Sequence, residues 1–226
     1  MFLLAEVIYL VYDYVRRIIV ITIGYCGNLK DFNPKPPTSK EAISLRDGLF
    51  FASSRTYGES YMEPLIRKIF NYTKPETSDY DAEDLIKNET FELKSAKVMK
   101  PKLNKSQCLF ERISSEAAYS PIKRIVKFKN RKIDHYDANI QNVKRDHFDY
   151  LIYILLFDEG IEIFKIKKED INTNGVKNWS DKHGRYDELG KSGQFNIKNN
   201  TISDHESKYF ERFVTYEDLV RIAKSI

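Results

Sequence analysis

The sequence predicts a mixed α/β fold, in which helices flank a central mixed β-sheet, and three observations lead to this prediction. Residues 40–50 and 58–71 space their apolar side chains as a helix with one buried face does. Residues 150–157 are a continuous apolar run rich in aromatic and β-branched side chains, which is typical of a strand buried on both faces. Short extended segments at residues 80–85 and 90–99 supply neighbouring strands.

A proline-rich segment at residues 31–38, which cannot continue a helix, precedes this fold. We therefore divide the chain into residues 1–37, an apolar helix and strand segment with its linker, and residues 38–226, the α/β domain. Thr38 or Ser39 can cap the first helix of that domain. Hydrophobic residues make up 42% of the chain and charged residues 31%, a composition that favours a soluble globular domain over a disordered chain.

Charged side chains interrupt the apolar residues 1–30, and their longest uncharged run, residues 18–29, is shorter than the ~20 residues of a membrane span. These residues also lack a clear secretory signal, which needs positive charge before the apolar stretch and a small-residue cleavage site. Two cysteines cannot build a disulfide framework. We therefore expect a cytoplasmic protein without a membrane segment, whose N-terminal segment packs on the domain or on a second subunit.

The later segments complete the mixed pattern. Residues 134–145 look helical, and residues 161–167 alternate as a strand with one solvated face. Residues 172–205 are polar and predict a long loop with one strand at residues 194–197. Residues 216–225 predict a closing helix. Two further short strands are expected, at residues 109–113 and 125–128.

Charge is unevenly distributed along the chain, although the net charge is only 37 − 33 = +4. Residues 94–132 hold twelve basic and two acidic side chains, a local balance of +10. An acidic stretch lies directly before them, opposed only by Lys87, and it consists of Asp79, Asp81, Glu83, Asp84, Glu89 and Glu92. An acidic cluster beside a basic surface suits a metal site that holds a phosphate polymer. The alternative interpretation is two solvated charged faces.

The extended segments on either side of residues 86–89 predict a β-hairpin, because Asn88 tolerates the positive φ of such a turn. Glu92 and Lys94 then project from the same face of the second strand, about 7 Å apart along the backbone. A four-residue loop places Asp81 directly opposite Lys94. A two-residue loop shifts the register by two and keeps Asp81 on that face. Asp84 points to the other face, although an odd-length loop without a bulge would reverse this choice.

These three side chains suit phosphodiester hydrolysis. Two carboxylates, Asp81 and Glu92, together with a backbone carbonyl can hold Mg²⁺ while leaving positions for water and phosphate. A lysine beside the metal can position the attacking water and stabilise the charge of the transition state. Zinc is disfavoured because the set lacks nitrogen and sulfur ligands.

Asp81, followed after one hairpin by Glu92-Leu93-Lys94 and preceded by a helix that carries Gly58-Glu59, resembles the PD-(D/E)xK nuclease superfamily. Within the superfamily the chain resembles type II restriction endonucleases, over roughly residues 40–170 in order and type. The resemblance implies a restriction-endonuclease-like core. It also implies metal ligation by Asp81 and Glu92, and a catalytic role for Lys94. Residue 80 is tyrosine where the motif has proline, which is a departure from the pattern.

The resemblance also implies an auxiliary acid on the preceding helix. Glu59 is the candidate, and Glu63, one helical turn later, is its rival. The expected partners are double-stranded DNA, Mg²⁺, a second copy of the chain in a homodimer, and functionally a DNA methyltransferase that protects host DNA.

Basic side chains outside the hairpin are candidates for DNA contact, with solvated surface as the alternative for each. A segment at residues 178–185 could reach base edges, although a structural role for Trp179 is the alternative there. The candidates are Lys123, Arg124, Lys127, Lys129, Arg131, Lys132, Lys182 and Arg185.

The sequence therefore predicts a Mg²⁺-dependent, sequence-specific endonuclease acting on double-stranded DNA. Three alternatives stay open. A repair or recombination nuclease of the same fold would act on DNA structure instead of sequence. A non-catalytic DNA-binding module would bind DNA without regard to Mg²⁺. A purely structural α/β protein would have no specific affinity for nucleic acid.

Overall fold

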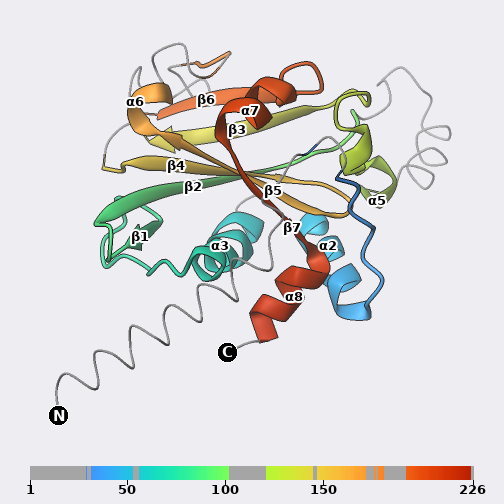
Figure 1. Ribbon diagram of the computed structural model, residues 1–226, viewed down its shortest axis with the longest axis horizontal. Coiled ribbons are helices and arrows are strands. Elements are labelled where there is room, and N and C mark those ends of the chain that lie inside the picture. The colour runs from blue at the N-terminus through green and yellow to red at the C-terminus, as the bar shows by residue number, and fades with distance from the viewer. Residues whose placement is uncertain are drawn as a thin grey trace, which may run out of the picture.

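A computed structural model shows a mixed α/β fold in which helices flank a curled, mixed central sheet (Figure 1). It describes residues 29, 32–52, 56–101, 121–144, 147–171, 176, 178–180 and 192–224. The predictions for residues 1–28, for a strand at 109–113, and for Lys182 and Arg185 lie outside these residues. None of the described helices combines the length and the hydrophobicity that crossing a bilayer requires.

The central sheet has five strands in the order β1-β2-β4-β5-β7. These are β1 (Ala82–Asp84), β2 (Glu89–Lys97), β4 (Tyr150–Leu156), β5 (Gly160–Lys167) and β7 (Phe210–Thr215). β2 and β4 run parallel, and the other pairs are antiparallel. The buried strand predicted at 150–157 is confirmed, because every residue of β4 after its first is buried. The hairpin that carries the candidate residues therefore lies at one edge of the sheet, beside its most buried strand.

One face of the sheet is covered by α2 (Lys40–Phe51), the π-helical turn η1 (Thr56–Met62), α3 (Glu63–Phe70) and α8 (Tyr216–Lys224) (Figure 1). The predicted helices at 40–50, 58–71 and 216–225 are thus confirmed in kind, and Ser39 is the N-cap of α2. The helical spacing of residues 58–71 predicts that Tyr61 lies on the buried face, but Tyr61 is 46% exposed. A π-turn changes the angle between successive side chains, so α-helical spacing does not predict which of them face inward there.

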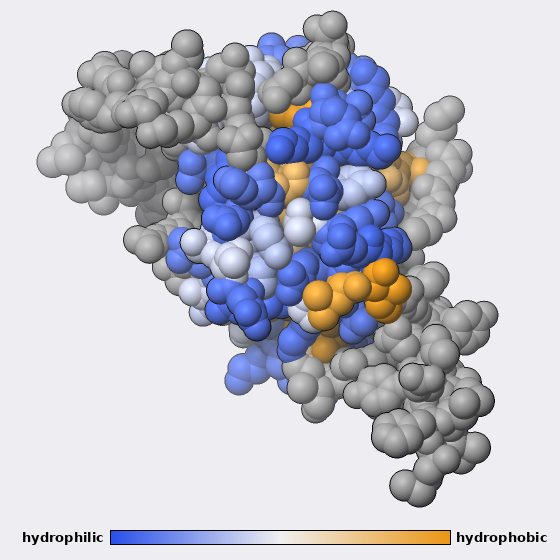
Figure 2. Space-filling view, turned by 90° about the vertical axis from the view of Figure 1, so that its left-hand side faces the viewer, coloured by the Kyte–Doolittle hydropathy of each residue, from blue (hydrophilic) through white to orange (hydrophobic). Residues whose placement is uncertain are grey.

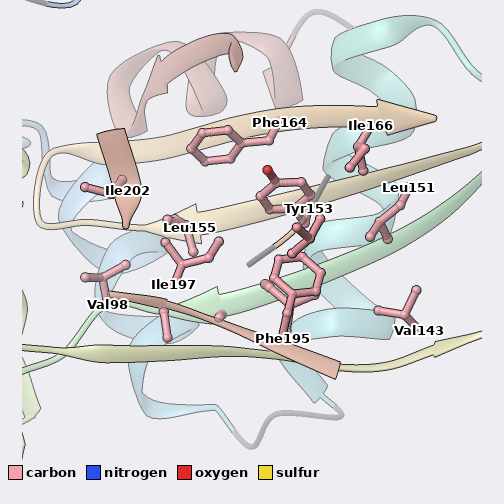
Figure 3. Close-up of a cluster of buried hydrophobic side chains, with 14 of the residues drawn as sticks. Val98, Val143, Leu151, Tyr153, Leu155, Phe164, Ile166, Phe195, Ile197 and Ile202 are labelled. Carbon is pink, nitrogen blue, oxygen red and sulfur yellow. The ribbon is translucent and has the colours of Figure 1, made fainter. Parts of the chain in front are cut away.

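The other face is covered by a two-stranded sheet, β3 (Asp137–Lys144) with β6 (Ser192–Lys198), and by α7 (Ile202–Tyr209). Figure 3 shows side chains of β4 and β5 meeting those of β3, β6 and α7 in one apolar layer, among them Tyr153, Phe164 and Phe195. Tyr153 and Phe164 stack with their ring centroids 4.8 Å apart, and Tyr153 meets Phe195 edge to face at 5.3 Å. This layer fixes β3 over the central sheet.

The helix predicted at residues 134–145 is wrong, because this segment forms strand β3. Tyr136, Ile140 and Val143 are buried at spacings of four and three, which is also the spacing of a helix face. The spacing arises here from a register shift between Ile140 and Val143, which adds a residue to the strand and breaks its alternation.

Three smaller differences complete the comparison with the predicted elements. The strand expected at 125–128 is only an isolated bridge between Met99 and Ile125, next to α5 (Pro121–Arg124) and the 3₁₀ turn η2 (Phe128–Asn130). The solvated face expected for β5 is covered, so that Glu162 has no exposed surface. β7 and α7 were not predicted, and the short helix α6 (Lys168–Asp170) follows β5.

Candidate active site

The β1–β2 hairpin turns one residue earlier than predicted, since Asp84 pairs with Glu89. When this register is continued by one residue, Asp81 lies across from Glu92 and not from Lys94. A shift of two residues leaves every side chain on its predicted face. The register that places Asp81 opposite Lys94 is therefore wrong, and a shift of two residues, which the sequence also allowed, is observed. The predicted common face of the three candidate residues is kept.

The early turn has a local cause. The Asp84 Oδ1 oxygen accepts hydrogen bonds from the backbone N–H of Ile86 at 3.0 Å and of Lys87 at 3.2 Å, which starts the turn at Asp84. Asn88 ends the turn with φ 54°, as its type predicts. Asp84 is thus used in the turn, on the face opposite to Asp81, as expected from the parity of the strand.

The Lys94 ammonium lies between the two candidate carboxylates. Its Nζ atom is 2.5 Å from Glu92 Oε1 and 3.5 Å from Asp81 Oδ2. The same Asp81 oxygen accepts the backbone N–H of Leu93 at 2.8 Å, which fixes the carboxylate against β2. Three residues from two strands therefore form one charged cluster.

Glu92 has no exposed surface, and both of its carboxylate oxygens lack a hydrogen bond from any described residue. Its close approach to Lys94 is an ion pair without the angles of a hydrogen bond, and the Lys144 ammonium lies 3.9 Å from Oε2. Burial raises the pKa of Glu92 above its ordinary 4.5, against the opposing effect of Lys94. A buried carboxylate with orphaned oxygens is a group that a cation stabilises.

The pKa of Lys94 is raised. Burial by itself lowers it, but the charges of Glu92 and Asp81 together outweigh the burial. Lys94 is therefore a cation in this arrangement, which suits it to holding a water molecule or a phosphate oxygen and not to removing a proton from water.

Asp81 and Lys94 line an open cleft of about 1090 Å³, whereas the fully buried Glu92 is not among the residues that line it. One wall comes from η1 and α3, a second from the loop before Asp81, and a third from β3. Figure 2 shows the side of the molecule on which the hairpin lies, where hydrophilic residues cover most of the described surface around an apolar patch. The turn carries two exposed aliphatic side chains, Leu85 and Ile86. The cleft is open to solvent.

Both candidate auxiliary acids, Glu59 and Glu63, lie in the cleft wall. Burial and the charge of Asp81 raise the pKa of Glu63 to about 7, and Arg67 and Lys94 act in the opposite direction. Glu63 lines the same cleft as Asp81 and Lys94. Arg67 connects the two, because its Nη1 atom donates to the Asp81 carbonyl at 2.8 Å and lies 3.6 Å from Glu63 Oε2.

The donor set fits a hard cation such as Mg²⁺ through Asp81 and Glu92. Within the described ranges, no group of three or more His, Cys, Asp and Glu side chains is placed to hold a metal ion. A cation held by these two carboxylates would therefore take its remaining ligands from backbone oxygen, water and a phosphate group.

The basic candidates near α5 and η2 are not brought to the cleft. They lie at the end of the sheet opposite to the β1–β2 hairpin (Figure 1), and none of the six that the structure describes is among the residues that line the cleft. Arg131 is 6% exposed, forms an ion pair with Glu206 and lies over the Phe128 ring at 3.8 Å. Arg124 donates to the Lys100 carbonyl at 2.7 and 2.9 Å.

The remaining candidates there are Lys123, Lys127, Lys129 and Lys132, which are exposed, and their contact with DNA stays a prediction. Lys132 is paired with Glu206 at 2.7 Å. Trp179 packs against Phe195, with ring centroids 6.2 Å apart, which supports its structural role.

Sequence reasoning missed several residues of the cleft. Arg67 and Lys144 reach the cluster from α3 and β3, and three amide side chains of β3 line the opposite wall, namely Asn139, Gln141 and Asn142. A strand in place of the predicted helix would have put Asn139 and Gln141 on one face. Nothing in the sequence predicts that this face of β3 lies over β2.

The chain was compared with protein-family models, with curated proteins and with solved structures, and none of the three comparisons found a match.

Proposed function

We propose that the chain is a Mg²⁺-dependent endonuclease of the PD-(D/E)xK type that cuts double-stranded DNA, and more specifically a type II restriction enzyme. The observation that carries the proposal is the cluster of Asp81, Glu92 and Lys94. All three project from one face of a hairpin at an open cleft, with the lysine 2.5 and 3.5 Å from the carboxylates.

In this proposal Asp81 and Glu92 hold the cation. When bound, Mg²⁺ lowers the pKa of a ligated water and stabilises negative charge on the phosphoryl oxygens. Lys94, whose ammonium lies 2.5 Å from Glu92 and 3.5 Å from Asp81, would orient the attacking water and donate hydrogen bonds to the phosphate. Arg67 keeps the Asp81 backbone in position through its carbonyl. Of the two candidates, Glu59 and Glu63, Glu63 fits the role of the auxiliary acid better.

The charged side chains of the cleft support the proposed substrate class. Five basic side chains line the cleft, Arg67, Lys74, Lys94, Lys97 and Lys144, together with four acidic ones, Glu59, Glu63, Glu76 and Asp81. Basic side chains around a carboxylate pair suit a polyanion that must approach a cation. Cutting both strands of a duplex symmetrically needs two active sites, so we propose a homodimer, and a methyltransferase as its functional partner.

The test is incubation of purified protein with unmethylated plasmid and phage DNA, in Mg²⁺ or in EDTA. We expect discrete fragments in Mg²⁺ only. Lys94→Ala and Glu92→Gln should each lower the rate at least about 100-fold. Glu92→Gln is included because it removes a buried charge and is expected to fold. Lys224→Ala is the control, since Lys224 lies on α8, pairs with Glu41 at 3.1 Å and is not among the residues that line the cleft.

Fragments of random length, or cleavage of branched DNA only, would support the structure-specific alternative. Folded wild-type protein that cuts no duplex, branched or single-stranded DNA in Mg²⁺ contradicts the proposal. Binding to DNA that is equal in Mg²⁺ and EDTA and unchanged in Glu92→Gln would favour the non-catalytic module.

A further inference from the structure

A β-bulge in β3 faces the catalytic strand across the cleft. Ile140 pairs with Phe195 of β6 and Val143 with Gly193, so Gln141 and Asn142 together oppose one residue of β6. Asn142 has φ 54°, in the left-handed region that asparagine tolerates better than most residues. Bulges re-aim side chains and are frequent next to active sites.

The bulge brings neutral amides to a wall of the cleft that also holds charged side chains. Gln141 and Asn142 are exposed, and Asn139, two residues before Gln141, is half-buried; all three line the cleft with Asp81 and Lys94. The Oδ1 atom of Asn139 is without a hydrogen bond from any residue that the structure describes. The exposed amides of Gln141 and Asn142 can therefore be reached by a molecule in the cleft, while the buried Asn139 Oδ1 atom lacks a partner among the described residues.

The amides are held in a defined place relative to the cluster. Lys144, at the end of β3, donates from Nζ to the carbonyls of Ser78 at 2.8 Å and Asp79 at 3.3 Å, and lies 3.9 Å from Glu92 Oε2. The residue of β6 opposite the bulge, Gln194, pairs its backbone with Ser180 on its other side at 2.8 and 3.0 Å. β3 is thus held from two directions. Lys144 connects it to the loop before Asp81, and its partner strand β6 is itself hydrogen-bonded to Ser180.

The chemistry of an amide matches a base edge better than a phosphate. Phosphates are bound by cations, whereas the amide of Asn or Gln donates and accepts at once and pairs with N6 and N7 of adenine in the major groove. A two-stranded ribbon such as β3–β6 fits the ~12 Å width of that groove. Residues i and i+2 of a strand lie about 7 Å apart, close to two base steps of about 3.4 Å each.

We propose that Asn139, Gln141 and Asn142 form the base-reading element of this protein and contact adenine-containing base pairs in the major groove, beside the phosphate that is cut. The inference rests on the proposed function, since it names how that site selects its DNA. The amides determine which sequence is bound, while the hairpin residues determine whether it is cut.

The experiment is selection of bound duplexes from a random pool by the cleavage-deficient Glu92→Gln protein, alone and combined with Gln141→Ala or with Asn142→Gly. Glycine at position 142 removes the amide and keeps the left-handed backbone. Asn200→Ala is the matched control, because Asn200 is an exposed amide in the turn after β6 and outside the residues that line the cleft. Protein with the wild-type amides is expected to enrich a site that contains A·T pairs.

Each bulge variant should lose about 10- to 100-fold of the discrimination at one base pair, which corresponds to one bidentate contact, and should keep its total affinity for DNA. The control should match the parent protein. Unchanged discrimination in both bulge variants, or no enriched sequence at all, overturns the inference even if wild-type protein cuts DNA. Enrichment that depends on Gln141 in a protein without nuclease activity upholds the reading element and refutes the proposed catalysis.

Discussion

The Lys94 ammonium lies 2.5 Å from a carboxylate oxygen of Glu92, and Glu92 has no exposed surface. A carboxylate in such a place needs a nearby positive charge, or it loses its charge by taking up a proton. Lys94 supplies that charge in this structure, with help from Lys144 at 3.9 Å. The lysine assigned to the reaction is therefore also a structural partner of the acid assigned to the metal.

Lys94→Met is expected to destabilise the protein by about 3 kcal/mol at pH 7, because it leaves Glu92 buried without its closest countercharge. Glu92→Gln should have the opposite effect and raise stability by about 1 kcal/mol, since it removes the buried charge itself. Urea unfolding of both variants in EDTA measures the difference. Equal destabilisation by the two substitutions would show that the ion pair is a net source of stability.

The stability difference between Glu92→Gln and the wild-type protein should change with pH in a defined direction. The pKa of Glu92 is raised above its ordinary 4.5 in the folded state, so wild-type protein loses stability as the pH rises from 4.5 toward the folded pKa. Glu92→Gln does not have this loss. The gain in stability of the variant should thus be larger at pH 8 than at pH 5.

Magnesium is expected to raise the melting temperature of the wild-type protein if Asp81 and Glu92 hold it. A ligand at about 100 times its Kd stabilises the folded state by about 2.7 kcal/mol. Asp81→Asn and Glu92→Gln should show little of this rise. Thermal unfolding in MgCl₂ is compared with KCl of equal ionic strength, and a rise of the same size in all three proteins would place the ion elsewhere.

Glu162 is a second fully buried acid, on β5, and neither of its oxygens has a hydrogen bond from a described residue. Burial and the charge of Glu206 raise its pKa well above 4.5, and Arg131 acts against this shift. The wild-type protein therefore loses stability from this group as the pH rises above 4.5. Glu162→Met should raise the free energy of unfolding by about 2 kcal/mol at pH 8 and by less at pH 5. A loss of stability at pH 8 would show that the carboxylate has a partner that favours its charge.

Glu217 of α8 connects the last helix to the first helix of the domain. Its Oε1 atom accepts the backbone N–H groups of Thr38 and Ser39, both at 2.8 Å, and its Oε2 atom accepts the Ser39 hydroxyl at 2.6 Å. The Ser39 and Thr38 hydrogen bonds lower the pKa of Glu217 to about 2. Its stabilisation is therefore complete above pH 4.5 and is lost as the pH falls from 4.5 to about 2.

Glu217→Gln removes this contribution. The variant should unfold more easily than wild-type protein at pH 6, and the two should approach one another near pH 2. Acid titration at a fixed urea concentration measures both. A difference that stays constant down to pH 2 would mean that the contribution of Glu217 does not depend on its charge.

Gly193 allows the only tryptophan of the chain to pack on β6, because a Cβ atom at this position would lie 2.0 Å from Trp179 Cζ2. Gly193→Ala should displace the indole, shift its fluorescence to longer wavelength and destabilise the protein by about 1–3 kcal/mol. Gly48→Ala is the control, since a Cβ there meets no atom within 4 Å and alanine suits the interior of α2. An unshifted spectrum in Gly193→Ala would contradict the contact.

The candidate site shows how far sequence reasoning extends. The common face of Asp81, Glu92 and Lys94 could be predicted, since strand alternation depends only on parity. The register could not, because it depends on which residue starts the turn, and the carboxylate of Asp84 starts it one residue early. The basic residues near α5 do not line the cleft, for a related reason. The position of a residue along the chain does not predict where it lies relative to a sheet.

By itself the sequence determined the local features of this protein: the cap at Ser39, the buried strand at 150–156, the hairpin and the face that carries its charged residues. Each depends on interactions between near neighbours or on a single strong apolar run. Only the tertiary structure decided that residues 137–144 form a strand and that its amides line the same cleft as Asp81 and Lys94. The apolar spacing of that segment fits a helix as well as a bulged strand, and packing against β6 and the central sheet selects the strand.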